Sequence, residues 1–456
     1  MIPRAWHNAL LPLLDPDQYR GLPQRLAELE QYEALSPVDQ AAIQEDRLRS
    51  LLDHAYKTSP YYRLVFDEMR FRSVDWQYGQ PIPLPELSRE LVRANMEHLC
   101  SRTFRPDQLR RFTSSGSLPT AMWRDIEAHR ARGAVHCHLD RLSGIVAART
   151  LEIRAADRQS EDHENPVARL IQERIMGRFS AAVRTPDDET FRSLLDRLNR
   201  CKPEALHGPS SLLAMFAEWL RTCGLPWHKP RRVITTGETP SPQARQALRD
   251  VFRCRVTAQY ICPDIGTLAI ECEIGERLHF HPWASYISLV PAGSSSEGSI
   301  YRLIVTDLLN HGMPLIRYDS GDCVLFDESP CPCGCWYPSI TAVLGPAIEN
   351  LILPNGSVTA GVPIVTRAGS AFRTVRGVQL IQKTPDTMHV RFAAGDDTSA
   401  ADRELGVFRR HIEDAFRVPL HWTMERVSEI PCERSGKIRV AICEIAPHRP
   451  ESRPAL

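Results

Sequence analysis

A run of small hydroxyl side chains interrupts the regular pattern of the chain at Thr113-Ser114-Ser115-Gly116-Ser117. A glycine-containing loop of this kind offers backbone N–H groups and hydroxyls that can surround a phosphate without a cluster of basic residues. Serine-rich loops are also common as plain connections, and composition alone favours that simpler interpretation. The loop therefore predicts a phosphate site only if groups of matching chemistry accompany it.

Two further segments carry groups of matching chemistry. Asp322 ends the sequence RYDSGD, and an ionised aspartate can accept two hydroxyl hydrogen bonds, as a carboxylate does on a ribose. Lys437 follows a flexible Ser-Gly step in ERSGKIRV, where a lysine can neutralise a carboxylate and a phosphate together. The simpler alternatives are a polar turn at Gly321 and a solvated surface lysine.

A cluster of cysteines gives a separate signal. Cys331, Cys333 and Cys335 lie in CPCGCWYP, and Cys272 precedes His279 in the upstream sequence ECEIGERLHFH. Thiolates and imidazoles are zinc ligands, and four of them in a tetrahedral array form a closed structural site. Buried free thiols are an equally weighted alternative, because the spacing matches none of the common zinc-finger patterns.

Length and composition limit the class of protein. The chain has 456 residues, 43% of them hydrophobic, which predicts a soluble globular protein with one large and one smaller domain. Its 56 basic and 56 acidic residues leave no electrostatic footprint for nucleic acid or an anionic membrane. No apolar run approaches a membrane span, and the first 20 residues do not resemble a signal peptide, so we expect a cytoplasmic protein.

The hydrophobic periodicity predicts an α/β fold with mixed sheets. Helical spacing recurs at 23–57, 85–101, 125–141 and 211–223, and short apolar runs such as 231–237 read as strands between crossover helices. The sequences ASYISLVPA and GSIYRLIVTDL predict two antiparallel strands joined through GSSSEGS.

The pattern restarts after about residue 345 as strand, strand, helix, strand and strand. We therefore predict a large N-terminal domain over 1–344, with a helical region over about 1–100, and a small, mobile α+β C-terminal domain over 345–456 that carries Lys437.

The order of these segments resembles one family over nearly the whole chain. The sequence is similar to adenylate-forming enzymes of the phenylacetate-CoA ligase and capsule-biosynthesis-associated branch. The N-terminal segments LLDHAYKTSPYYRLVFDE and LPELSRELVRANMEHL match that branch. Six ordered blocks follow them: TSSGSLPT, ALHGPSSL, VITTGETP, QYICPDIGTLAIECEIGERLHFHP, RLIVTDLLNHGMPLIRYDSGD and IPCERSGKIRVAI.

The resemblance implies a two-step reaction. A carboxylic acid attacks the α-phosphate of ATP to give an acyl-adenylate and pyrophosphate, and CoA, an amine or a carrier protein then takes the acyl group. Ser114, Ser115, Gly116 and Ser117 would hold phosphate. Four further nucleotide contacts follow from the resemblance: Gly237 and Glu238 at the adenine, Tyr260 on the base, and Asp322 on the ribose.

The catalytic and metal-binding roles are also implied by the resemblance. Asp264 stands where the family usually has a glutamate that helps to hold Mg²⁺, and an oxygen ligand suits that cation. Lys437 would stabilise the charge that develops between the carboxylate and the α-phosphate. A structural Zn²⁺ on Cys272, His279, Cys331 and Cys333 is a further expectation, with Cys335 as a substitute ligand, and a homodimer is a further possibility.

Three departures from the family pattern keep other functions open. The phosphate loop is two residues short, because Ser117 runs directly into Leu118-Pro119. Pro346 replaces the usual arginine at the hinge, and Ile261 replaces a glycine. Two alternatives follow, namely an ATP-independent acyltransferase and a noncatalytic protein on the same fold.

Overall fold

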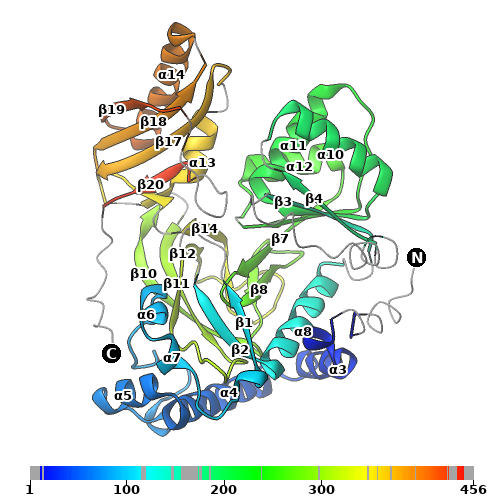
Figure 1. Cartoon of the computed structure of the whole chain (residues 1–456), viewed down its shortest axis with the longest axis vertical. Helices are drawn as coiled ribbons and strands as arrows, with labels where there is room; N and C mark the ends of the chain where they lie inside the picture. The colour runs from blue at the N-terminus through cyan, green and yellow to red at the C-terminus, as the bar shows by residue number, and fades with distance from the viewer. Residues whose placement is uncertain are drawn as a thin grey trace.

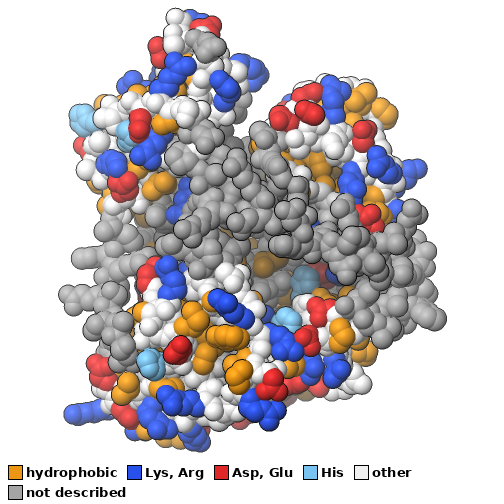
Figure 2. All heavy atoms as spheres, in the orientation of Figure 1, with side chains coloured by type: hydrophobic (Ala, Val, Ile, Leu, Met, Phe, Trp, Pro, Cys, Tyr) orange, Lys and Arg blue, Asp and Glu red, His pale blue; other side chains and the backbone are white. Residues whose placement is uncertain are grey.

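The protein is described here from a computed structural model of the whole chain (Figure 1). The structure describes residues 11–12, 15–113, 120–144, 148–155, 173, 177–183, 186–237, 239–295, 298–346, 349–356, 358–369, 372–395, 397–428, 430 and 439–445. Within these ranges, no helix is both long enough and apolar enough to span a membrane. On the face drawn in Figure 2, basic and acidic side chains are interspersed.

The N-terminal helices run along one end of the molecule (Figure 1). Three of the four α-helices begin at serine or aspartate caps, and α3 begins at Gly21; Ser36, for example, accepts a hydrogen bond from the backbone of Asp39. Their apolar faces are buried, as the helical periodicity predicted. The helices are α2 (Pro16–Tyr19), α3 (Leu22–Glu33), α4 (Pro37–Thr58) and α5 (Pro60–Glu68), followed by the short 3₁₀ turns η1 (Ser73–Asp75) and η2 (Pro106–Gln108).

The single helix expected over 85–101 is instead two short helices. They are α6 (Arg89–Ala94) and α7 (Met96–Leu99), separated by Asn95. The side chain of Asn95 donates to the carbonyl of Leu91 at 3.0 Å, and this local bond competes with continuation of the helix. Just before α6, Leu87 forms a parallel bridge with Tyr318, which fixes the start of α6 against a distant strand.

An eight-stranded sheet forms the middle of the molecule, in the order β13-β9-β8-β7-β6-β5-β3-β4. Strands β7, β6, β5, β3 and β4 are parallel to one another, and β8, β9 and β13 continue the sheet in antiparallel fashion from β7. The strands are β3 (Thr150–Ala155), β4 (Arg178–Val183), β5 (Ala205–Pro209), β6 (Arg232–Thr236), β7 (Arg255–Cys262), β8 (Gly266–Glu271), β9 (Leu278–Phe280) and β13 (Ser339–Ile340).

Helices α10 (Asp188–Cys201), α11 (Ser210–Cys223) and α12 (Pro242–Phe252) cover one face of the parallel part (Figure 1). They share an apolar core with the inward side chains of β3, β5, β6 and β7. Helix α8 (Ile126–Leu142) packs against α2, α3 and β8, so it joins the N-terminal helices to the sheet. The expected α/β architecture with mixed sheets is confirmed.

A second sheet is antiparallel, in the order β10-β11-β12-β14. It contains the predicted antiparallel pair β10 and β11, whose register runs from Ser285 opposite Asp307 to Ser295 opposite Gly298. A separate hairpin, β1 with β2, precedes α8. The bounds are β1 (Leu109–Thr113), β2 (Ala121–Asp125), β10 (Ser285–Ser295), β11 (Gly298–Asp307), β12 (Tyr318–Phe326) and β14 (Ala342–Pro346).

The C-terminal part has a sheet and an apolar core of its own, at the opposite end of the molecule from the N-terminal helices (Figure 1). Its four-stranded sheet has the order β19-β18-β17-β20 and packs against two helices. The elements are β15 (Asn350–Ile352), β16 (Val358–Ala360), α13 (Gly361–Ala368), β17 (Val375–Thr384), β18 (Thr387–Ala394), α14 (Thr398–Phe416), β19 (His421–Arg426) and β20 (Ala441–Cys443). We call residues 349–445 the C-terminal unit.

Candidate functional site

Two of the predicted nucleotide-binding side chains meet between the two large sheets. The hydroxyl of Tyr260, on β7, donates to Oδ2 of Asp322, on β12, at 2.7 Å. Tyr260 is 4% exposed, and burial together with the neighbouring Asp322 raises the pKa of its hydroxyl well above the usual value. The phenol therefore stays protonated and acts as a hydrogen-bond donor that orients the carboxylate.

Asp264 lies just beyond the same strand and is fully buried. Its Oδ2 accepts hydrogen bonds from Arg89 Nη2 at 2.6 Å and from the hydroxyl of Tyr318 at 2.7 Å. Its Oδ1 has no partner among the described residues. One carboxylate oxygen of Asp264 is thus paired with a guanidinium. The role of Asp264 as a magnesium ligand stays a prediction.

Gly237 follows β6 at the carboxyl end of the parallel strands, where ligands bind in open α/β sheets. Its φ of 82° is a left-handed conformation that favours glycine, and an added Cβ would meet no atom of the described residues within 4 Å. Two residues later, Thr239 accepts a hydrogen bond from the backbone of Val343 on β14 at 2.8 Å. This contact holds the turn after β6 against the antiparallel sheet that carries Asp322.

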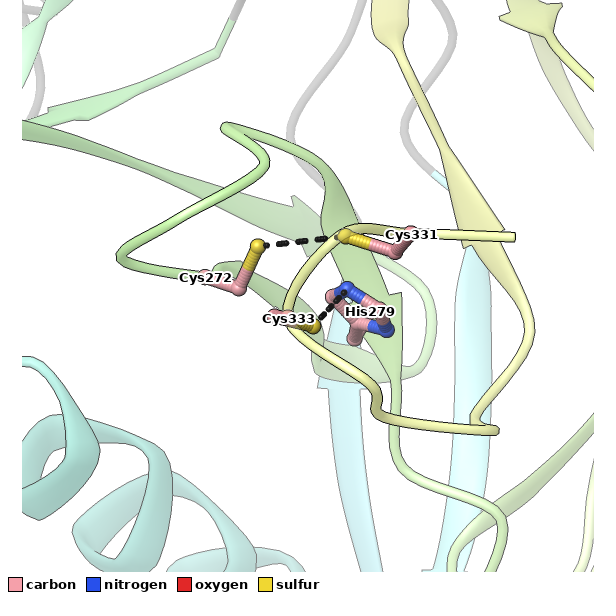
Figure 3. A group of neighbouring side chains, drawn as sticks. All are labelled: Cys272, His279, Cys331 and Cys333. Carbon is pink, nitrogen blue, oxygen red and sulfur yellow. Dashed lines mark hydrogen bonds between the residues drawn. The ribbon is translucent and has the colours of Figure 1, made fainter. Parts of the chain in front are cut away.

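The cysteine cluster forms a second site, between β8, β9 and the segment after β12 (Figure 3). The ligand atoms of Cys272, His279, Cys331 and Cys333 all lie within 4.8 Å of one another. Cys272 Sγ is 3.5 Å from Cys331 Sγ, and Cys333 Sγ is 3.5 Å from His279 Nε2. Two 2.3 Å bonds at a tetrahedral angle place sulfur atoms about 3.8 Å apart, so the four side chains fit one zinc ion.

The surroundings of the cluster also suit a metal. His279 Nδ1 lies 3.3 Å from the carbonyl oxygen of Tyr337, a contact that fixes the tautomer with Nε2 turned to the sulfurs. The backbone N–H of Gly275 donates to Cys272 Sγ at 3.3 Å, and this bond, with that from Arg277, lowers the pKa of the Cys272 thiol against the opposing effect of burial. A Cβ on Gly275 would lie 2.4 Å from Cys331 Sγ, so only glycine fits here.

Comparison with known proteins gives the fold its context. The chain superposes on 2-hydroxyisobutyryl-CoA ligase, solved in its postadenylation state with an acyl-AMP, with a TM-score of 0.66 and 16% identity over 91% of this chain and 92% of that one. This protein has the fold of the adenylate-forming ligases. The McyG A-PCP structure, complexed with phenylalanyl-adenylate, gives a TM-score of 0.50 and 11% identity over 72% of this chain and 56% of McyG.

A curated relative extends the similarity to the sequence. Protein CapK of Staphylococcus aureus is 21% identical over 419 residues, which cover 88% of this chain and 89% of CapK. No protein-family model matches the sequence. The resemblance inferred from the ordered blocks is confirmed at the level of the fold, and the similarity to CapK is consistent with the capsule-associated branch.

Several expected residues of this adenylate-forming fold lie outside the described residues. They are Ser114, Ser115, Gly116, Ser117, Glu238 and Lys437. The structure describes residues that flank them in the sequence. The predicted phosphate loop would connect β1 to β2. Arg439, two residues after Lys437, lies 3.9 Å from the buried Glu349.

Sequence reasoning missed two side chains at the site. Tyr318 lies in the block RYDSGD and Arg89 in LPELSRELVRANMEHL, two blocks on which the family resemblance rests. Nothing in the sequence indicates that Tyr318 and Arg89 bond to Asp264. Their positions depend on the bridge between Leu87 and Tyr318, which are 231 positions apart.

Proposed function

We propose that this adenylate-forming protein uses ATP to activate a carboxylic acid as an acyl-adenylate and then transfers the acyl group to CoA, an amine or a carrier protein. The observation that carries the proposal is the 2.7 Å hydrogen bond between Tyr260 and Asp322, next to the open turn at Gly237. These groups lie at the carboxyl end of the parallel strands in a chain that has this fold over 91% of its length.

Asp322 is the proposed ribose ligand. An ionised carboxylate has about four lone-pair sites, so Oδ2 can accept from Tyr260 and still take part in binding hydroxyl groups. Tyr260 acts by orienting that carboxylate. Gly237 and Glu238 would border the adenine, and Ser114–Ser117 would contact the phosphates.

Lys437 is the proposed catalytic cation. It would approach the carboxylate and the α-phosphate from the C-terminal unit, which we propose is the small mobile domain that begins near residue 345. Support comes from the separate sheet and core of that unit. A cation placed where negative charge develops lowers the barrier to adenylation more than it strengthens substrate binding.

Magnesium would enter with ATP, and Asp264 is its proposed protein ligand through Oδ1, the oxygen that has no partner among the described residues. Arg89, which donates to the other oxygen at 2.6 Å, holds the carboxylate in one orientation. Without a bound ligand, the negative charge of Asp264 is thus balanced by the guanidinium of Arg89.

The acid and the acceptor remain to be chosen among the classes above. Exchange of labelled pyrophosphate into ATP, measured over aryl, acyl and amino acids, tests the proposal directly. We expect one class of acid to support exchange in the wild type, and Lys437→Ala to abolish most of it while AMP still raises the melting temperature. The matched control is Lys383→Ala, which removes an exposed lysine of the same unit. No exchange with any acid, and no stabilisation by ATP or AMP, would refute the proposal.

We also propose that Cys272, His279, Cys331 and Cys333 bind one structural zinc ion. The ion would join the β8–β9 corner, close to the strand of Tyr260, to the segment that follows β12. The 3.5 Å sulfur separation and the glycine-only contact at Gly275 support this. Cys335 is outside this converging group, which contains only the four named residues among the described ones.

A second candidate activity is acyl transfer without ATP. It is favoured by Pro346, which stands opposite Asp322 in the β12–β14 ladder and stiffens the chain just before the C-terminal unit. Product formed from an acyl-CoA without ATP would support this activity, and absolute dependence on ATP would exclude it. A protein that does neither, yet binds AMP, would be a noncatalytic member of the fold.

A further inference from the structure

Two buried histidines and a glutamate converge at a place that the proposed function does not use. Glu33 ends α3, His138 lies in α8, and His281 directly follows β9. Their ligand atoms all lie within 4.8 Å of one another. Glu33 Oε1 is 2.8 Å from His138 Nε2 and 4.0 Å from His281 Nε2.

His281 is the unusual member of this group. It is 2% exposed, and neither of its ring nitrogens has a hydrogen-bond partner within the part of the chain that the structure describes. A neutral imidazole carries one donor and one acceptor, and burying both without partners is unfavourable. The rings of His138, Tyr32 and Tyr337 surround it at centroid distances of 5.5, 5.7 and 5.4 Å, so the vacant nitrogens lie in an enclosed place.

We propose that Glu33, His138 and His281 bind a second divalent transition-metal ion, with zinc as the best match. Two imidazoles and a carboxylate form an established zinc ligand set, with bonds of about 2.0–2.2 Å. Two such bonds at a tetrahedral angle separate the ligand atoms by about 3.3 Å, a value between the observed 2.8 and 4.0 Å. Three protein ligands leave a fourth position for water.

Arg141 competes with the metal at this site. Its Nη2 lies 3.2 Å from His138 Nδ1, and its other amino group pairs with Glu30. A neutral histidine that binds a metal through Nε2 carries its proton on Nδ1, which then cannot accept from a guanidinium. Metal binding therefore displaces one Arg141 contact, while the pair with Glu30 remains.

The two metal sites are neighbours with different chemistry. The carbonyl of Tyr337 lies 3.3 Å from His279 Nδ1 of the cysteine cluster, and the ring of Tyr337 packs on His281. One site is rich in sulfur and the other has only nitrogen and oxygen ligands. The second ion would tie α3 and α8 to the strand that carries the first site.

Metal content of the full-length protein tests the proposal without any activity assay, so its failure is distinguishable from failure of the proposed function. After zinc loading and removal of loosely bound metal, we expect two zinc equivalents per wild-type chain. His281→Phe keeps an aromatic ring against Tyr32 and Tyr337 but offers no ligand, and we expect it to hold one equivalent. Cys331→Ser should lose the other equivalent.

Cobalt(II) substitution assigns each ion. The wild type should show sulfur-to-cobalt charge-transfer absorption together with weaker bands of a nitrogen and oxygen site, and His281→Phe should keep only the sulfur-dependent spectrum. Arg141→Met should tighten cobalt binding at the second site at least several-fold. A wild type that binds a single, sulfur-ligated ion would overturn the proposal, as would two equivalents retained in His281→Phe. If His281→Phe does not fold, the presence or absence of the nitrogen and oxygen bands in the wild-type cobalt spectrum tests the proposal.

Discussion

The nucleotide corner and the cysteine cluster both connect the eight-stranded sheet to the segments around β12, but they do so with different chemistry. At the nucleotide corner, Tyr260 and Asp264 of the first sheet bond to Asp322 and Tyr318 of the second. At the cluster, Cys272 and His279 face Cys331 and Cys333. The first connection is made by hydrogen bonds between protein side chains, whereas the second brings together three thiols and an imidazole, for which we propose a zinc ion.

This difference matches two roles. Hydrogen bonds to a carboxylate can be shared with an incoming hydroxyl group, so the nucleotide corner can respond to a ligand. Metal–thiolate bonds are strong and keep their geometry, so the cluster can hold the two segments in register while the ligand changes. We therefore expect the second connection to contribute more to stability and the first more to binding.

Metal removal should give the largest effect. Cys331→Ser should lose one zinc equivalent relative to the wild type, and its free energy of unfolding should fall by about 4 kcal/mol or more where free zinc exceeds the dissociation constant a thousandfold. Elemental analysis and denaturant unfolding measure the two quantities.

Cys335→Ser is the matched control, because Cys335 lies in the same loop but outside the converging group. It should keep the zinc of the wild type. Equal loss of metal in both variants would make Cys335 a ligand as well, and no loss in Cys331→Ser would show that the thiols are simply buried cysteines.

The next largest effect should be on the rate of adenylation. Lys437→Ala should lower the rate of adenylation by about 10²–10³-fold, as expected for loss of a group that acts on charge in the transition state. AMP binding should change little, because the lysine acts mainly on the transition state. An equal loss of AMP affinity and rate would instead place Lys437 in ground-state binding.

The sequence predicted the cluster and the fold better than it predicted the nucleotide corner. The four side chains of the cluster could be found because thiols and imidazoles are few and chemically distinctive, and the ordered blocks identified the fold. The partner of Asp264 could not be found, since arginines are abundant and nothing local marks Arg89. Its position depends on the bridge from Leu87 to Tyr318 and on the break at Asn95 that divides the predicted helix.

Loss of Arg89 should destabilise the nucleotide corner by an intermediate amount. Breaking a buried ion pair costs about 3–5 kcal/mol, but the Arg89 side chain is 31% exposed, which reduces the expected loss for Arg89→Met to about 2 kcal/mol. Adding Asp264→Asn should recover part of it, because the unpaired buried charge is then gone.

Arg93→Met is the control for this prediction, since Arg93 lies in the same helix and pairs only loosely with Glu90, at 3.6 Å. It should cost no more than about 0.5 kcal/mol in urea unfolding. Equal stability of the Arg89 and Arg93 variants would show that the Asp264 contact is energetically neutral.

The smallest effect on nucleotide binding should come from Tyr260→Phe, which separates stability from binding at the nucleotide corner. The variant loses one hydrogen bond to a charged acceptor, about 1.5–3 kcal/mol of stability, while Asp322 keeps its charge and can still bind a ribose. We therefore expect AMP affinity to fall less than about tenfold, which is about 1.4 kcal/mol. Asp322→Asn should show the opposite pattern, with little loss of stability and a larger loss of AMP affinity by calorimetry. Tyr301→Phe, on the neighbouring strand β11, controls for loss of a partly buried hydroxyl. If Tyr260→Phe lowered AMP affinity more than Asp322→Asn, the tyrosine rather than the carboxylate would be the main contact to the nucleotide.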